Sequence, residues 1–157
     1  MNKLTITAGD NNDLIMTRSF DAPRDLVFKA FTTPELIKRW LFGPPGWEMT
    51  ECAIDLRVGG KYRYAWSNID GSSMGMGGEY REINKPEKIV STEKFDQAWY
   101  EGEAIGTLTL TEANGKTTAV TKVQYGSKET RDNVLKSPME SGVAAGYDRL
   151  EEVLASL

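Results

Sequence analysis

The sequence predicts an α+β domain in which consecutive antiparallel strands form a sheet and a long amphipathic C-terminal helix lies on it. Three observations support this class. Strand-like alternation recurs between turn signals from Glu48 onward, short helical segments follow the first long strand, and the last twenty residues repeat apolar side chains at helical spacing. At 157 residues we expect one domain, spanning residues 1–157.

The N-terminal part is expected to contain two strands and two short helices. Asp13 to Phe20 alternates between two faces and predicts a strand, with a shorter strand at Leu4 to Thr7. After Phe20 the apolar period becomes helical, and Pro23 suits a first helical position. Thr33-Pro34-Glu35 repeats the helix start signal, so a second short helix should carry Leu36, Ile37 and Trp40.

The middle of the chain predicts a loop followed by an antiparallel meander. Prolines and glycines between Phe42 and Trp47 prevent a helix there. Strand-like segments then alternate with turn signals at residues 59–60, 70–71, 84–86 and 114–115. Asn114-Gly115 favours a two-residue type I′ turn, because both residues tolerate positive φ. The glycine-rich stretch 71–78 indicates either a flexible hairpin tip or a strand that passes close to another group.

The C-terminal segment predicts the longest helix. Ser137-Pro138-Met139-Glu140 has the pattern of a capping box with proline at the first helical position. One face of the predicted helix is apolar, with Met139, Val143, Tyr147, Leu150 and Leu154. This amphipathic helix should therefore pack on the sheet.

Composition excludes several classes of function. A net charge of −4 without a cluster of Lys and Arg argues against a nucleic-acid partner. No apolar run could span a membrane and the N-terminus lacks a signal-peptide core, so we expect a cytoplasmic protein. The lone Cys52 is interpreted as a small buried hydrophobe. Because the sequence has no histidine, zinc sites and most hydrolytic triads are excluded, and we expect neither a metal nor another cofactor.

Aromatic residues are the main candidates for a ligand site. Tyr62, Tyr64 and Trp66 alternate along one predicted strand and so share a face. Tyrosine and tryptophan carry polar atoms that need partners when buried, which favours a cavity with polar groups over a purely apolar core, although each residue alone fits an ordinary core. The candidate ligand-binding residues are Trp40, Phe42, Trp47, Tyr62, Tyr64, Trp66, Tyr80, Phe95, Trp99 and Tyr147.

Other polar patterns give weaker signals, and none identifies a catalytic residue. Asp55 and Arg57 share a strand face and are expected to form a structural ion pair. Glu101 and Glu103 also share a face, but nothing around them predicts desolvation, so we interpret both as solvated. The glycines at residues 75–78 do not have the spacing of a phosphate loop.

Several short motifs together resemble a known family. They are Asp21-Ala22-Pro23-Arg24, Val27 to Thr32, Pro34-Glu35, Arg39-Trp40, Asp55 to Gly60, Gly78 to Ile83, Pro86 to Val90 and Gly142 to Leu150. In this order they resemble the START-like helix-grip superfamily (SRPBCC), and within it the branch of activators of the 90-kDa heat-shock protein ATPase. One departure is Trp40-Leu41, where the family often has two tryptophans.

The resemblance implies a curved antiparallel sheet that wraps around the C-terminal helix and encloses an apolar cavity. Across the superfamily such cavities hold lipids, polyketides and other apolar molecules. Binding of an apolar or amphipathic small molecule, lipid-like or polyketide-like, is therefore the leading hypothesis. The protein would be a monomer or a homodimer.

The sequence also allows two alternative functions. The family name implies a protein-interaction module that activates a chaperone ATPase, but the chaperone-binding N-terminal domain of the eukaryotic activator is not among these 157 residues. Cyclases among the superfamily imply an enzyme that uses cavity Tyr, Glu or Arg. A carboxyl group with a shifted pKa in an enclosed pocket would support that alternative.

Overall fold

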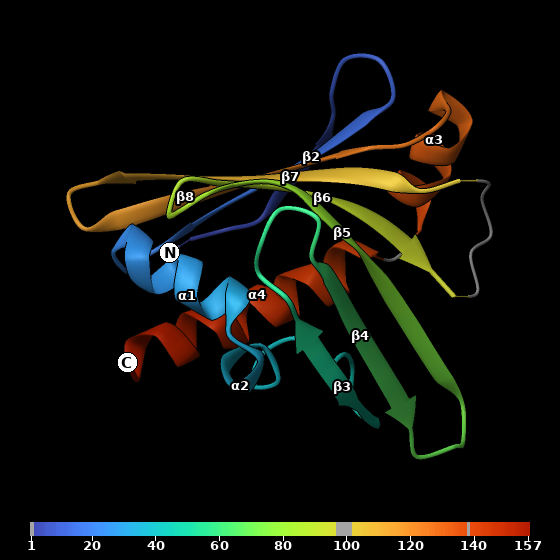
Figure 1. Cartoon of the computed structure of the whole chain (residues 1–157), viewed down its shortest axis with the longest axis horizontal. Helices are drawn as coiled ribbons and strands as arrows, with labels where there is room; N and C mark the ends of the chain where they lie inside the picture. Colours follow the sequence, from blue (N-terminus) through green and yellow to red (C-terminus); the bar gives the residue numbers. More distant parts are fainter. Residues whose placement is uncertain (1, 97–101, 138) are drawn as a thin grey trace.

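The computed structural model describes residues 2–96, 102–137 and 139–157, and its centre is one strongly curved antiparallel sheet. The eight strands are ordered β1-β2-β8-β7-β6-β5-β4-β3. Figure 1 shows the long helix α4 running across the concave side of the sheet, with α1 beside it. The predicted α+β helix-grip class is therefore confirmed.

The strands and helices have the following bounds. The strands are β1 (Thr5–Ala8), β2 (Asp13–Phe20), β3 (Trp47–Ile54), β4 (Lys61–Asn68), β5 (Ser73–Asn84), β6 (Lys88–Phe95), β7 (Ala104–Ala113) and β8 (Lys116–Gln124). The helices are α1 (Arg24–Thr32), α2 (Pro34–Ile37), α3 (Lys128–Lys136) and α4 (Met139–Ala155).

The N-terminal prediction holds with three differences. β1 is shifted by one residue, Pro23 is the N-cap residue of α1 and not its first helical residue, and the second short helix ends early. α2 stops at Ile37, so Trp40 is not part of it. The backbone N–H of Trp40 donates to Ile37 O at 3.1 Å, which is the tighter i to i+3 pattern of a closing turn. The chain cannot continue as a helix through Gly43 and Pro44, because Gly43 has a φ of 87° and Pro44 has no backbone N–H to donate. The helix therefore ends one turn earlier than the apolar spacing predicts.

The glycine-rich stretch is a strand that passes close to its neighbours. Gly75, Gly77 and Gly78 all lie in β5. A Cβ atom at Gly78 would lie 1.9 Å from Thr92 O on β6, and one at Gly77 would lie 2.7 Å from Tyr62 O on β4. Only glycine allows both approaches, so the second of the two interpretations of residues 71–78 is the correct one. At Asn114-Gly115 both φ angles are positive, as a type I′ turn requires.

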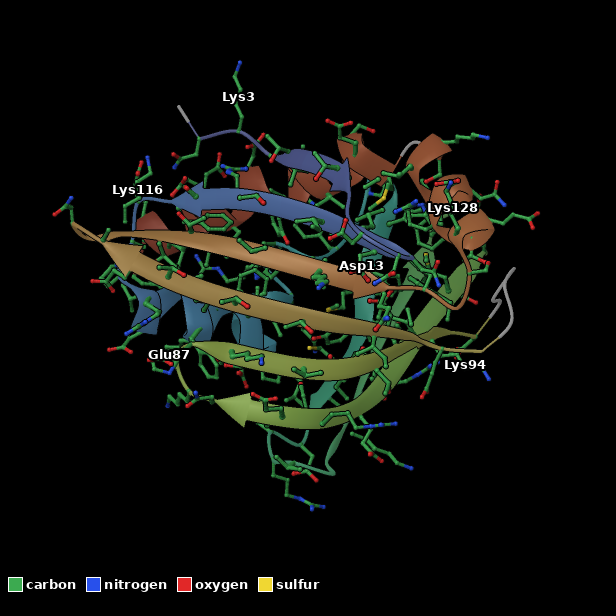
Figure 2. The ribbon with its side chains drawn as sticks, turned by 90° about the horizontal axis from the view of Figure 1, so that it is seen from above. Lys3, Asp13, Glu87, Lys94, Lys116 and Lys128 are labelled. Atoms are coloured by element: carbon green, nitrogen blue, oxygen red, sulfur yellow. The ribbon has the colours of Figure 1, made fainter. Side chains whose placement is uncertain are left out.

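Helix α3 was not predicted from the sequence. Its N-cap is Ser127, whose side chain accepts a hydrogen bond from Thr130 N at 3.1 Å. Arg131 lies on its buried side and donates to Asp13 O at 2.9 Å. Figure 2 shows Asp13 and Lys128 at the same end of the sheet, away from the turn at Lys116. Helix α3 therefore packs against the start of β2.

Helix α4 supplies the apolar face that the sequence predicts. Its buried residues are Gly146, Tyr147, Leu150, Val153 and Leu154. Within the predicted capping box, Pro138 lies outside the described residues, and the Ser137 hydroxyl donates to Val134 O at 2.6 Å at the end of α3. Tyr147 and Leu150 join Phe20, Val27 and Phe28 in the main core between sheet and helices.

Candidate functional site

The inner face of the β4 and β5 half of the sheet is aromatic. The rings of Tyr62 and Tyr64 lie 5.1 Å apart, those of Tyr64 and Trp66 lie 6.1 Å apart, and those of Tyr62 and Tyr80 lie 5.5 Å apart. The predicted alternation along β4 is therefore present, because these three side chains share a face and Arg63 points away to pair with Asp96. The result is a continuous wall of phenol and indole rings.

A cavity of about 170 Å³ lies against this wall. It is lined by Phe31 of α1 and by residues from β4 to β8: Tyr62, Tyr64, Met76, Tyr80, Ile89, Ser91, Glu93, Gly106, Leu108 and Thr121. None of these eleven lining residues is a lysine or an arginine. The cavity is thus mostly apolar and has a few polar groups on the β6 side.

Small residues on neighbouring strands leave this space open. Ser91 of β6 lies opposite Gly106 of β7, and Glu93 lies opposite Ala104. A Cβ atom at Gly106 would meet only Ser91 O, at 3.9 Å, so the position could carry a larger side chain but does not. The cavity therefore follows from particular small residues.

Glu93 is the one ionisable carboxyl group among the lining residues. Its side chain is partly buried, and desolvation raises its pKa. Within the part of the chain that the structure describes, its carboxylate has no hydrogen-bond or ion-pair partner. An unpaired carboxyl group in a largely apolar cavity is expensive to ionise, so it marks the polar end of the site.

The phenol groups of Tyr64 and Tyr80 stay neutral near pH 7. Burial raises the pKa of Tyr64 well above its ordinary value, with smaller contributions from Tyr80, Cys52, Tyr62 and Glu93. Burial likewise raises the pKa of Tyr80. Cys52 lies opposite Tyr64, and burial raises the pKa of its thiol to about 11, which fits the structural role expected for it.

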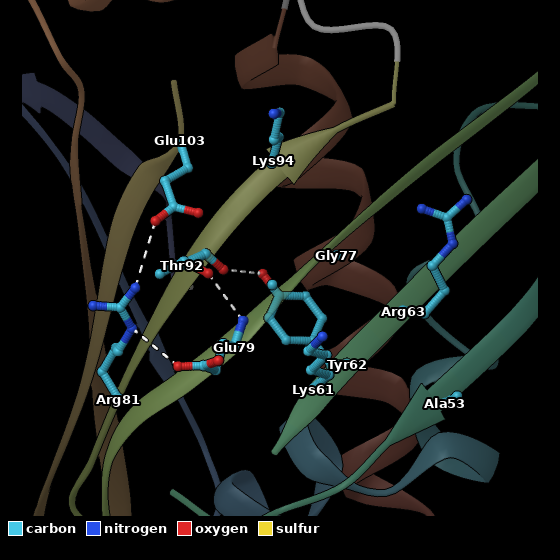
Figure 3. A pocket seen from close by; sticks show the side chains of 11 residues that line it. Ala53, Lys61, Tyr62, Arg63, Gly77, Glu79, Arg81, Thr92, Lys94 and Glu103 are labelled. Carbon is cyan, nitrogen blue, oxygen red and sulfur yellow. Dashed lines mark hydrogen bonds and ion pairs between the residues drawn. The ribbon is translucent and has the colours of Figure 1, made fainter. Parts of the chain in front are cut away.

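Thr92 holds β5 and β6 together where their pairing is interrupted. The register pairs Gly77 with Lys94 and then Tyr80 with Ser91. Between these pairs the Tyr62 hydroxyl donates to Thr92 O at 2.7 Å, and the backbone N–H of Glu79 donates to Thr92 Oγ1 at 2.9 Å (Figure 3). The ring of Tyr62 is fixed against the cavity by this contact.

The outer side of the same strands carries an open, charged depression of about 570 Å³. Arg81 forms ion pairs with Glu79 at 3.4 Å and with Glu103 at 3.5 Å, as Figure 3 shows. Glu103 is exposed, in agreement with the expectation of a solvated carboxylate, and Glu101 lies outside the described residues. These charges are paired across a solvated strand surface.

Two apolar depressions of about 340 Å³ each flank the loop between α2 and β3. Both are lined by Leu41, Gly43 and Pro44. One continues onto α4, at Met139, Val143 and Tyr147, and the other onto Trp47, Trp66 and Met74. They share no lining residue with the cavity. The rings of Trp40 and Tyr147 contact Phe31 of the cavity wall, and the ring of Trp66 contacts Tyr64.

Arg149 of α4 anchors this loop. Its Nε donates to Trp40 O at 3.1 Å, and its guanidinium lies 4.0 Å from the centre of the Phe42 ring. The indole of Trp66 donates to Leu41 O at 2.7 Å. The loop is therefore fastened to both the helix and the sheet.

The structure divides the ten predicted aromatic residues among several places. Tyr62, Tyr64 and Tyr80 line the cavity, and Trp40, Trp47, Trp66 and Tyr147 line the two apolar depressions. Phe42 stacks on Arg149 and lines none of these three spaces. Phe95 lies at the end of β6 beside a depression with Arg63 and Asp96. Trp99 lies outside the described residues.

Sequence reasoning missed the polar side of the cavity. Ile89, Ser91 and Glu93 alternate along β6, and all three line the cavity. The two-residue period was visible in the sequence. Since Ile89 is buried, the side chains two and four residues further along the strand face the same side. Thr121 on β8 could have been found by the same period only with the strand register.

The predicted pair Asp55 and Arg57 forms an ion pair at 2.9 Å in the turn after β3, where both side chains are exposed. Within residues 2–96, 102–137 and 139–157, no group of three His, Cys, Asp or Glu side chains could hold a metal ion. In the same part of the chain no helix is long and apolar enough to cross a membrane.

The sequence matches a protein-family model described as "Activator of Hsp90 ATPase homolog 1-like protein" over residues 21–155. The chain belongs to this family. It thereby has the SRPBCC-type fold that the resemblance implied. No curated protein matches the chain.

Solved structures agree with the family assignment. A protein of Rhodobacter sphaeroides is 32% identical, with 99% of each chain covered and a TM-score of 0.92. A protein of Mycobacterium smegmatis shares the fold at 23% identity, 98% coverage of each chain and a TM-score of 0.84. CalU16 of Micromonospora echinospora shares it at 20% identity and a TM-score of 0.63, with 98% of this chain and 73% of that one covered.

Proposed function

We propose that this protein binds a small, mostly apolar molecule in the cavity between the sheet and the helices. The observation that supports this best is a cavity of about 170 Å³ whose walls are aromatic and whose lining includes Tyr64, Tyr80 and Glu93. Among the described residues, no hydrogen-bond partner is found for the hydroxyls of Tyr64 and Tyr80 or for the carboxyl of Glu93. A ligand with one polar end would satisfy these groups.

The cavity volume limits the size of the ligand. Pockets for drug-sized molecules have volumes of roughly 300–1,000 Å³, so about 170 Å³ suits a compound with one ring. A lipid-like or polyketide-like molecule would have to displace boundary rings such as Trp40 and Trp66, and would then extend into the depressions beside the loop. We therefore propose a one-ring ligand for the cavity as it stands.

A cavity-filling variant tests this proposal. Gly106 alternates with Leu108 on the inner face of β7, so Gly106→Leu should fill the space without a backbone clash. We expect toluene and benzyl alcohol to raise the Tm of the natural protein and to shift the NMR signals of β5 and β6. In Gly106→Leu both responses should fall at least tenfold in apparent affinity.

Thr107→Leu is the matched control, because it adds the same side chain to the same strand at the next position, on the other face. It should leave probe binding unchanged. Loss of binding in both variants, or no response of the natural protein to either probe, would contradict the proposed cavity function. Native mass spectrometry of freshly purified protein would identify a retained molecule.

A protein-interaction role is the second candidate, and only the description of the family supports it. The measurement is the ATPase rate of a bacterial 90-kDa chaperone with and without this protein. Stimulation that persists in Gly106→Leu would favour a surface interaction over the cavity. An unchanged ATPase rate would remove this candidate.

A further inference from the structure

The buried charges of this protein have ionic partners. Arg18 is 4% exposed and lies 3.1 Å from Asp148, and Asp13 is 4% exposed and lies 3.3 Å from Lys122. Arg131 is 5% exposed and lies 2.8 Å from Asp132. This pattern is expected, because a charge removed from water is tolerated only when an opposite charge or hydrogen bonds compensate.

Glu93 departs from this pattern. It lines the cavity, its carboxylate has no ion-pair or hydrogen-bond partner in the described parts of the chain, and the lining residues include no lysine or arginine. On β7 its cross-strand neighbour is Ala104, which cannot reach it with a polar atom. The compensating positive charge is therefore missing from the cavity walls themselves.

The rings beside Glu93 suit a cation as well. The ring centre of Tyr62 lies 5.1 Å from that of Tyr64 and 5.5 Å from that of Tyr80, and all three residues line the same cavity. The charge of Glu93 is also one cause of the raised pKa of Tyr64, after burial, Tyr80, Cys52 and Tyr62. Aromatic faces attract organic ammonium groups, and a neighbouring carboxylate adds an ion pair.

We propose that the cavity ligand is a small organic cation, an amine attached to an apolar body, whose ammonium group pairs with Glu93 among Tyr62, Tyr64 and Tyr80. This inference rests on the proposed function, since it specifies the chemistry of the ligand in the same cavity. The amine supplies the charge that the lining lacks. An anionic ligand would instead face repulsion from the same carboxylate.

Binding of such a cation must depend on pH. The titratable groups that line the cavity with Glu93 are Tyr62 and Tyr64 on β4 and Tyr80 on β5. Burial raises the pKa of Tyr64 and of Tyr80, so these two remain neutral near pH 7. Glu93 also has a raised pKa, so it is protonated over a wider pH range than an exposed glutamate. Amine affinity should therefore fall as the pH falls through the pKa of Glu93, with a proton released on binding.

Three probes of similar shape test the charge preference in the full-length protein: benzylamine, benzyl alcohol and benzoate. By NMR titration at pH 8, benzylamine should bind at least tenfold more tightly than benzyl alcohol, and benzoate more weakly than either. In Glu93→Gln, benzylamine should lose its advantage over benzyl alcohol. Glu51→Gln is the control, since it removes the same charge from an exposed position of β3.

The outcomes separate the two proposals. If benzyl alcohol binds in the cavity but benzylamine binds no more tightly, or if Glu93→Gln keeps the preference, the cation proposal is wrong and the cavity function stands. If none of the three probes binds, both are wrong. If Glu51→Gln also loses the preference for benzylamine, the preference comes from the net charge of the protein, and the proposed role of Glu93 is wrong.

Discussion

The two halves of the sheet use different side chains against the helices. The half formed by β2, β8 and β7, which we call the dense half, packs fully buried residues such as Phe20 and Leu110 against α1 and α4. The half formed by β4, β5 and β6, which we call the cavity half, presents tyrosines, Met76 and Glu93 around a cavity. The dense half therefore supplies close packing, and the cavity half supplies most of the residues that line the cavity, together with Gly106, Leu108 and Thr121 of β7 and β8.

The largest expected effect comes from truncating the dense half. Leu150 of α4 is completely buried, so Leu150→Ala should lower the free energy of unfolding by about 3–4 kcal/mol, through lost burial and a new void. Met76→Ala, on the cavity side, should cost about 1 kcal/mol, because its neighbours already leave empty volume. Urea denaturation of both variants measures the contrast. Equal losses would show that the two halves are packed alike.

A pair of glycines in β5 gives a smaller effect that tests the cavity half alone. In Gly78→Ala the new Cβ would lie 1.9 Å from Thr92 O, which is backbone, so β5 must move and stability should fall by about 2–3 kcal/mol. In Gly75→Ala the Cβ would meet the side chains of Arg63 and Asp96, which can turn aside, at a cost of about 1 kcal/mol.

Thermal unfolding of the two glycine variants, with and without benzyl alcohol, checks this pair. Gly78→Ala should also weaken probe binding, because it displaces Thr92 and the Tyr62 hydroxyl that donates to it. A similar stability in both variants would mean that the close approach of β5 to β6 is not a constraint.

The sequence predicted the elements of this fold better than the site. Strand alternation around Asp13 to Phe20, the Asn114-Gly115 turn and the apolar face of α4 depend on local patterns, and the structure confirms all three. The cavity depends on which residues face one another across strands. That Gly106 lies opposite Ser91 follows from a register set by the whole sheet.

Helix α3 was missed for a related reason. Most of its residues are polar or charged. Its buried Arg131 donates to the backbone carbonyls of Gly9 and Asp13, which are distant in the sequence. Nothing in a periodic apolar pattern indicates such a helix, because its buried anchor is a charged residue. The cap at Ser127 was the available local signal.

The smallest effect, and the one most specific to the cavity half, concerns Glu93. Because its folded-state pKa is raised, the folded protein holds this proton more tightly than the unfolded chain does. The stability that this proton contributes is complete below the ordinary glutamate pKa and is lost as the pH rises through the folded pKa. Glu93→Gln removes the ionisation, so the variant should be more stable than the natural protein at pH 8, by on the order of 1 kcal/mol, and similar to it near pH 4.

Urea unfolding at both pH values measures this difference, with Glu51→Gln as the exposed control. A Glu93→Gln variant that is less stable at pH 8 would mean that the carboxylate has a stabilising partner in the folded protein, and the cavity would then not lack a positive charge. Adding benzylamine should reverse the order of stability at pH 8, because the ligand supplies that charge to the natural protein alone. The ligand would then compensate the charge of Glu93 in the cavity half, as ion pairs compensate the buried charges of the dense half.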